Sequence, residues 1–189
     1  MRRRRLLGLT AAGTLGAAAG CLGDRAGDDG AGGENDSTDG GGGSDGGDGE
    51  SAWPTGAYAD YETTTVTVAG PDGELKGSVT AAIASTGPER RLGLSDAESL
   101  PGDSGMLFVY GSPRDSLTYV MRRMSFGIDI VYADGDREIT RIHNAPEPGP
   151  NEDGEEQRYP GSGQYVLEVP YEWTDRHGVG VGDSLRFDL

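Results

Sequence analysis

The chain contains very little of the side-chain chemistry from which disulfides, metal sites and nucleophilic centres are built. Its 189 residues include one cysteine, Cys21, and two histidines, His143 and His177. A single thiol excludes an intramolecular disulfide. Neither histidine has another histidine or a cysteine at the spacing of metal ligands. We therefore predict neither a metal site nor a cofactor.

Positive charge is also scarce in this sequence. It has 16 basic and 32 acidic residues, which gives a formal net charge of -16, and Lys76 is its one lysine. Such a charge repels phosphate backbones, so nucleic acid is disfavoured as a partner. A shortage of lysine beside abundant arginine, aspartate and glutamate resembles the composition of proteins from extremely salt-adapted archaea. The acidity is therefore expected to reflect a salty environment and says little about partners.

The sequence has no run of about 20 strongly apolar residues, the length that a transmembrane helix needs. Its most apolar stretch, residues 6–19, is shorter and interrupted by glycines. Arginines at residues 2–5 precede this stretch and resemble a twin-arginine export signal, while the small residues before Cys21 resemble a lipobox. We expect residues 1–21 to be a signal peptide. A lipid on Cys21 would then anchor the protein in the membrane at the extracellular face of the cell.

The segment that follows Cys21 has too few apolar side chains to build a core. Residues 22–51 consist mainly of glycine, aspartate, serine, asparagine and glutamate. Burial in such a segment cannot offset the loss of chain entropy. We predict a disordered acidic tether over residues 22–60, of which residues 22–51 span about 30 Å as a flexible coil.

Residues 61–189 show the short alternating apolar runs and turn residues of a mainly β domain. Two hairpins are expected, one around Pro71-Asp72-Gly73 and one around Asp134-Gly135-Asp136. A capping box at Thr86-Gly87-Pro88-Glu89 predicts a short helix, and a second helical turn is expected over residues 171–177. The predicted fold is a compact antiparallel sandwich or barrel-like domain with one or two short helices.

The strands themselves are expected over residues 105–110, 117–121 and 165–169, in addition to those of the two hairpins. A long loop rich in proline and glutamate is expected from residue 144 to residue 163.

Seven segments of this domain resemble, in order and spacing, an uncharacterised family called domain of unknown function 192. The segments are Pro88-Glu89-Arg90-Arg91-Leu92-Gly93-Leu94, Ser99-Leu100-Pro101, Gly105-Met106-Leu107-Phe108, Tyr119-Val120-Met121-Arg122, Ile128-Asp129-Ile130, Tyr165-Val166-Leu167-Glu168-Val169 and Val181-Gly182-Asp183. The resemblance implies a sandwich or barrel-like β fold and a family without an established biochemical role. It therefore carries over a fold and no mechanism.

The sequence departs from that family at two places. The family's usual run of an aromatic residue, Trp, Met, Lys and Asn reads Tyr119-Val120-Met121-Arg122-Arg123 here, so the Trp and the Asn are lost. Many members also carry a cysteine pair in the loop that corresponds to residues 144–163, and this loop has no cysteine. Thiol chemistry in the loop is excluded.

The candidate binding residues are Met121, Arg122, Asp129 and His143. Asp129 is the notable carboxylate because it stands between Ile128 and Ile130 in an apolar strand, where it either points to solvent or is buried beside an arginine. His143 ends a strand next to the long loop, although a structural role is the simpler reading of this histidine.

Three classes of function follow from these features. The first is a binding or accessory module on the cell surface, with an extracellular small molecule, a glycan or an envelope protein as partner. The second is a small extracellular enzyme that uses carboxylate and histidine acid-base chemistry, for which Asp129 and His143 must share a pocket. The third is a purely structural envelope component. Catalysis is the less favoured of the first two, and no catalytic residue is assigned.

Overall fold

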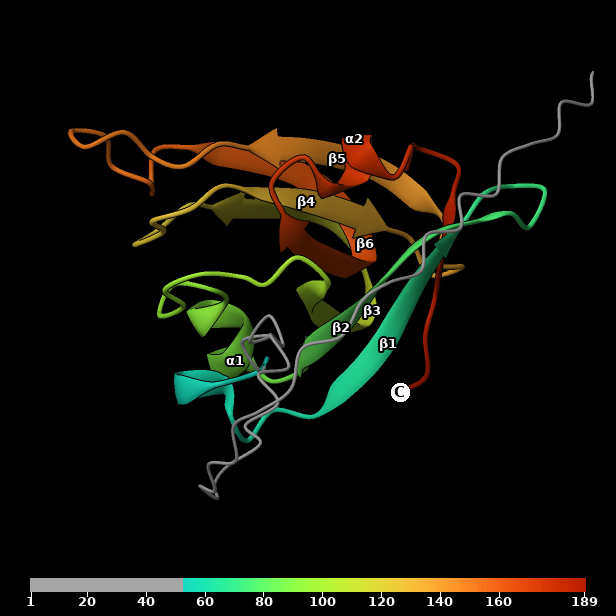
Figure 1. Cartoon of the computed structure of the whole chain (residues 1–189), viewed down its shortest axis with the longest axis horizontal. Coiled ribbons are helices and arrows are strands. Elements are labelled where there is room, and N and C mark those ends of the chain that lie inside the picture. Colours follow the sequence, from blue (N-terminus) through green and yellow to red (C-terminus); the bar gives the residue numbers. More distant parts are fainter. Residues whose placement is uncertain (1–52) are drawn as a thin grey trace, which may run out of the picture. The chain divides into compact units, whose positions relative to one another are not determined.

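A computed structural model describes residues 53–189 of the chain (Figure 1). The predicted signal peptide, Cys21 and the tether up to residue 52 lie outside this part. Among the residues that are described, no helix is both long enough and apolar enough to cross a membrane.

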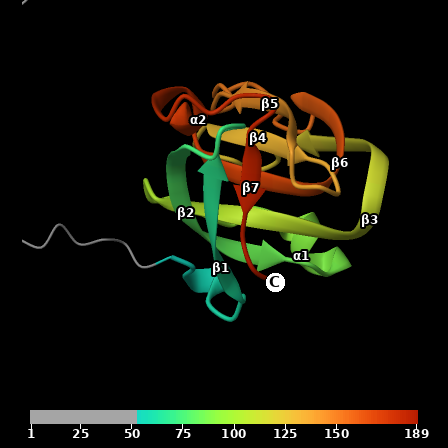
Figure 2. The same ribbon diagram turned by 90° about the vertical axis from the view of Figure 1, so that its right-hand side faces the viewer.

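Seven strands form one sheet in the order β5-β4-β6-β3-β2-β1-β7. The strands are β1 (Thr63–Ala69), β2 (Leu75–Ala84), β3 (Ser104–Val120), β4 (Ile128–Ala133), β5 (Ile139–Ala145), β6 (Arg158–Pro170) and β7 (Ser184–Arg186). The sheet curls strongly (Figure 2). Its two ends meet at a single bridge between Glu138 and Ser184. This arrangement confirms the predicted mainly β, barrel-like domain.

All neighbouring strands are antiparallel except β2 and β3. Parallel neighbours need a crossover connection, and the crossover here contains the helix α1 (Gly87–Leu92). The predicted capping box begins this helix: Thr86 Oγ1 accepts from the Glu89 N–H at 3.4 Å, and Glu89 Oε2 accepts from the Thr86 N–H at 2.8 Å. Both predicted hairpins are present as β1–β2 and β4–β5.

The predicted strands at 105–110 and 117–121 are two halves of one long, bent strand, β3. Its pairing with β6 shifts register on both sides of Arg114. The bend brings the ring of Tyr119 back over Phe108, with ring centroids 5.0 Å apart. The second half of β3 pairs with the start of β6, which begins at Arg158. The loop predicted over residues 144–163 is therefore shorter than expected.

The two faces of the curled sheet bury separate hydrophobic clusters. The inner cluster lies within the curl and includes Trp173 from α2 (Trp173–Arg176), Leu185 from β7 and Phe187, which follows β7. The outer cluster lies between the opposite face and a cover made of the N-terminal segment and the turn after α1. Phe108, Ile130 and Val166 belong to this outer cluster.

The folded part begins earlier than the predicted boundary at residue 61. A short 3-10 helix, η1 (Gly56–Tyr58), places the ring of Tyr58 in the outer cluster with 1% of its surface exposed. Trp53 Nε1–H donates to the Gly105 carbonyl at 2.8 Å. These two aromatic side chains stand in a segment otherwise rich in small and polar residues. The burial of Tyr58 and the hydrogen bond of Trp53 attach residues 53–60 to the domain.

Candidate functional site

A cavity of about 200 Å³ opens on the outer side of the sheet. Three parts of the chain surround it: α1 with the turn that follows, the bent strand β3 with the turn after it, and the centre of the sheet. The lining residues are Arg90, Arg91, Leu92, Gly93, Leu94, Ser95, Phe108, Tyr110, Thr118, Tyr119, Val120, Arg122, Met124, Ile128 and Glu168. We call this space the outer cavity.

Glu168 is the single carboxylate among the residues that line the outer cavity. On β6 it stands opposite Met106 of β3 and Ile130 of β4, which places its side chain on the outer face at the centre of the sheet. Only 5% of the residue is exposed, and Oε2 has no hydrogen-bond partner among the residues described. Buried polar atoms without a partner are rare in folded proteins, because desolvation costs free energy that no bond returns.

Burial raises the pKa of the Glu168 carboxyl from its ordinary value of 4.5 to about 8. At neutral pH this group is therefore mostly protonated. A buried carboxyl with a raised pKa inside a cavity is a feature typical of functional sites.

Aromatic rings form one wall of the outer cavity. The hydroxyl groups of Tyr110 and Tyr119, from the two halves of β3, lie 3.1 Å apart and share a hydrogen bond. Burial, followed by the proximity of Tyr110 and Glu168, holds the pKa of Tyr119 well above its usual range. The phenol of Tyr119 therefore remains a neutral hydrogen-bonding group at physiological pH.

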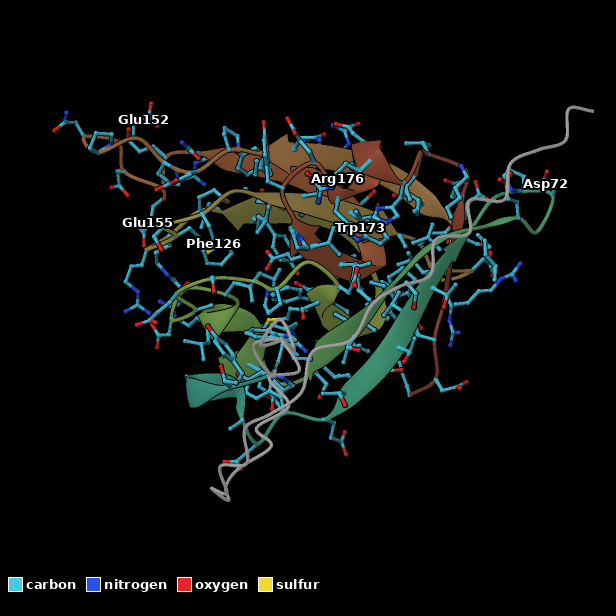
Figure 3. The ribbon with its side chains drawn as sticks, viewed as in Figure 1. Asp72, Phe126, Glu152, Glu155, Trp173 and Arg176 are labelled. Atoms are coloured by element: carbon cyan, nitrogen blue, oxygen red, sulfur yellow. The ribbon has the colours of Figure 1, made fainter. Side chains whose placement is uncertain are left out.

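Arginines surround the mouth of the outer cavity. The guanidinium of Arg90 lies 4.8 Å from the ring centre of Tyr110 and donates to the Val109 carbonyl at 2.9 Å. Arg122 donates to the Arg91 carbonyl, and its Nε lies 4.0 Å from Glu155 Oε1. Figure 3 shows Glu155 at the opposite end of the domain from Asp72 in the β1–β2 turn. Arg91 and Arg122 also line a shallow depression next to the cavity.

The structure does not bring the four predicted binding residues into one site. Arg122 lies at the mouth of the outer cavity. Met121 is fully buried in the outer cluster, where its N–H donates to the Gly154 carbonyl at 2.9 Å. Asp129 and His143 lie on opposite faces of the sheet, because Asp129 pairs with Asn144 across β4 and β5 while His143 pairs with Ile130.

Asp129 holds the start of α2 on the inner face. Its Oδ1 accepts from the Glu172 N–H at 2.9 Å, and its Oδ2 accepts from the N–H and the hydroxyl of Thr174 at 2.8 and 2.6 Å. Burial still raises the pKa of Asp129, since the desolvation outweighs these three bonds. This geometry is that of a structural carboxylate that fixes the N-terminus of a short helix.

His143 contacts aromatic neighbours on the other face. Its ring lies against those of Tyr132 and Tyr159, and its Nε2 is 2.9 Å from the Pro160 carbonyl. The acid-base pair of Asp129 and His143 that the enzyme alternative requires is therefore not formed. Glycoside hydrolysis uses two carboxylates on either side of the bond, and the lining of the outer cavity supplies one.

Sequence reasoning missed Glu168, although the signal that singled out Asp129 is present there too. Glu168 stands in the apolar run Val166-Leu167-Glu168-Val169. The sequence offers no sign of which of the two acids is hydrogen-bonded within the fold. The contribution of Tyr110 and Tyr119 depends on the bend in β3, for which the sequence also gives no clear signal.

Comparison with known proteins places this domain among proteins without an established role. The profile of DUF192, described as "Uncharacterized ACR", matches residues 67–187, nearly two thirds of the chain. No curated protein matches significantly.

Two solved structures are similar. A protein of Sinorhizobium meliloti, described as a candidate transcription regulator, is 26% identical with a TM-score of 0.60 over 67% of this chain and 95% of its own. A protein of unknown function from Novosphingobium aromaticivorans is 27% identical with a TM-score of 0.57 over 72% of this chain and 94% of its own.

Proposed function

The chain belongs to the DUF192 family of uncharacterised proteins, and we propose that it binds a small molecule in the outer cavity. The observation that carries this proposal is the carboxyl of Glu168, which is buried at the cavity with one oxygen that lacks any partner among the described residues. A ligand that donates a hydrogen bond to this carboxyl would offset the cost of burying it without a partner.

The shape and lining of the outer cavity support a small solute over the other partners considered. Its volume of about 200 Å³ is below the range of about 300–1,000 Å³ of typical drug-sized sites. It combines aromatic walls with a few polar groups, as small-molecule sites do. A binding role is also favoured over a purely structural one, because a structural domain gains nothing from an unpaired buried carboxyl.

The description of the Sinorhizobium relative as a transcription regulator is not extended to this chain. A net charge of -16 opposes contact with a phosphate backbone.

We test the proposal by a thermal-shift screen of the purified chain in high salt against sugars, metal ions and small metabolites. A ligand at about 100 times its Kd is expected to raise Tm by several degrees, since it binds the folded state alone. The rise should be lost in Glu168→Gln and reduced in Arg122→Ala. It should persist in Glu138→Gln, an exposed acid outside the cavity lining.

Two results would count against the binding function. One is a screen in which no compound raises Tm. The other is a ligand whose shift is the same in the unaltered chain, in Glu168→Gln and in Arg122→Ala, because such a ligand binds elsewhere.

We further propose that this binding domain is displayed outside the cell on a lipid anchor. The proposal rests on the arginines at residues 2–5, the apolar stretch and the small residues before Cys21. In cells, Cys21→Ser should move the protein from the membrane fraction to the medium or the soluble fraction. Mass spectrometry of the N-terminal peptide should find a lipid on Cys21 of the unaltered chain; a membrane fraction without the protein would contradict the anchor.

A further inference from the structure

We propose that the ligand of the outer cavity is a small zwitterion whose ammonium group lies against Glu168 and whose carboxylate lies at the arginines of the mouth. This inference rests on the proposed binding function and names the chemical class of the ligand. It is drawn from the arrangement of charge between the base and the mouth of the cavity.

The base of the cavity offers acceptors and electron-rich faces to a cation. Glu168 Oε2 has no donor among the described residues. Three ionisable groups interact electrostatically with Glu168: the phenols of Tyr58 from η1, Tyr119 from β3 and Tyr132 from β4, none of which is a cation. An ammonium group brings three donors and a positive charge, so it suits a carboxylate better than a single hydroxyl donor does.

The aromatic wall already holds a cation within the protein itself. The guanidinium of Arg90 lies over the ring of Tyr110, an arrangement in which the ring quadrupole attracts the positive charge. Phe108 and Tyr119 complete the wall on the side of the sheet. A ligand ammonium at the base would therefore meet ring faces and edges as well as the carboxyl.

The mouth of the outer cavity carries positive charge, in contrast to the acidic group at its base. Arg90, Arg91 and Arg122 line this cavity, and Arg123 lines the adjacent depression together with Asp153 and Glu155, in a chain where acidic residues outnumber basic ones by 32 to 16. Arg90 and Arg123 are engaged, the latter with Asp96 at 2.7 Å. Arg91 has no ion-pair partner among residues 53–189, and Arg122 has only the 4.0 Å contact with Glu155. A carboxylate is the natural partner of the Arg91 guanidinium and of the remaining N–H donors of Arg122.

Binding of the ammonium should release a proton. The carboxyl of Glu168 is mostly protonated at neutral pH, because burial raises its pKa to about 8. An adjacent positive charge favours the ionised form. The O–H bond of the carboxyl breaks, the proton passes to the buffer, and the ligand keeps its three ammonium protons. A neutral ligand would leave the carboxyl protonated.

We test this with isothermal titration of the full chain in phosphate and in Tris at pH 7. The probes are glycine, 3-aminopropanoate, 4-aminobutanoate, 5-aminopentanoate and 6-aminohexanoate, which separate the two charges by one more methylene at each step. Butylamine, butanoate and glucose are the single-charge and neutral controls. One amino acid of the series should bind at least about tenfold more tightly than butylamine and butanoate, consistent with one added charged contact. Its apparent binding enthalpy should differ between the two buffers, because the released proton, up to one per ligand, is taken up by buffers with different ionisation enthalpies.

Two variants test separately the contact of the ammonium group and the contact of the carboxylate. Glu168→Gln should weaken the best amino acid by about tenfold or more and abolish proton release. Arg122→Gln, a change at a half-exposed position, should reduce its affinity to that of butylamine while leaving butylamine itself unchanged. Arg141→Gln, an exposed arginine on β5 outside the cavity lining, should change nothing.

The outcomes distinguish this inference from the proposed function. If glucose or another neutral compound binds in a Glu168-dependent manner without proton release, and no amino acid binds more tightly than butylamine, the zwitterion is wrong and small-molecule binding stands. A second outcome is that Glu168→Gln and Arg122→Gln change the binding of none of the probes and none of the screened compounds. In that case the zwitterion and small-molecule binding in the outer cavity are both wrong.

Discussion

Asp129 and Glu168 are buried acids on the neighbouring strands β4 and β6, and they lie on opposite faces of one sheet. On the inner face, Asp129 accepts three hydrogen bonds that fix the start of α2. On the outer face, Glu168 Oε2 accepts none from the described residues, and the residue lines a cavity. An acidic residue in the same kind of apolar strand thus completes the fold on one side and stays without a partner on the other.

The sharpest way to break this comparison is to remove the inner acid. Asp129→Ala leaves two backbone N–H groups and one hydroxyl without their acceptor, so we expect the free energy of unfolding to fall by about 3 kcal/mol or more. Urea unfolding of the purified chain measures the loss. Asp136→Ala, in the exposed turn that follows β4, is the control and should stay within about 0.5 kcal/mol. A loss for Asp129→Ala no greater than that of the control would show that Asp129 does not hold α2.

The effect of Glu168, the outer acid, should appear in the pH dependence of the free energy of unfolding. The folded-state pKa of Glu168 is raised from 4.5 to about 8, so the folded state binds the proton more tightly than the unfolded state. The stabilisation from this group is then complete below about pH 4.5 and is lost as pH rises towards 8, at no more than about 1.4 kcal/mol per pH unit. Glu168→Gln has no such proton. Unfolding free energies at pH 5 and pH 8 should therefore fall by a few kcal/mol more in the unaltered chain than in the variant, and parallel pH profiles would contradict a buried, unpaired carboxyl.

The smallest expected effect tests one bond of the inner network. Thr174→Val removes the hydroxyl that donates to Asp129 Oδ2 at 2.6 Å and keeps the side-chain shape. We expect a loss of about 1.5–3 kcal/mol in the free energy of unfolding, the range for a hydrogen bond to a charged group. Thr174→Ser retains the hydroxyl and should preserve more of the stability in the same urea experiment. Equal losses in the two variants would mean that packing, and not the bond, accounts for the effect.

Local patterns of the sequence predicted the parts of the fold that depend on near neighbours. The hairpin turns, the capping box at Thr86 and the end of α2 before Gly178, whose φ is 62°, are found where they were expected. The halves of β3 were expected as separate strands, because the bend near Arg114 is stabilised by pairing with β6, far away in the sequence. The attachment of residues 53–60 was missed for the same reason, since it depends on Trp53 reaching Gly105.

For the candidate site, the sequence identified Arg122, which lines the outer cavity. It grouped Arg122 with Met121, Asp129 and His143, which do not line that cavity. Alternation within β4 and β5 places Asp129 and His143 on opposite faces only once the register between the two strands is known. The sequence shows equally well that Glu168 interrupts an apolar run, yet it cannot say whether a buried acid finds donors.

The sequence by itself determined the mainly β class, the acidic charge, the short helix after β2 and the membership of an uncharacterised family, because composition, period-2 patterns and ordered motifs are local properties. Tertiary structure alone decided which carboxyl is satisfied and which is not. That distinction depends on donors brought from distant segments: residues 172 and 174 reach Asp129, whereas the bent β3 and α1 surround Glu168 with rings and arginines and leave its Oε2 unpaired.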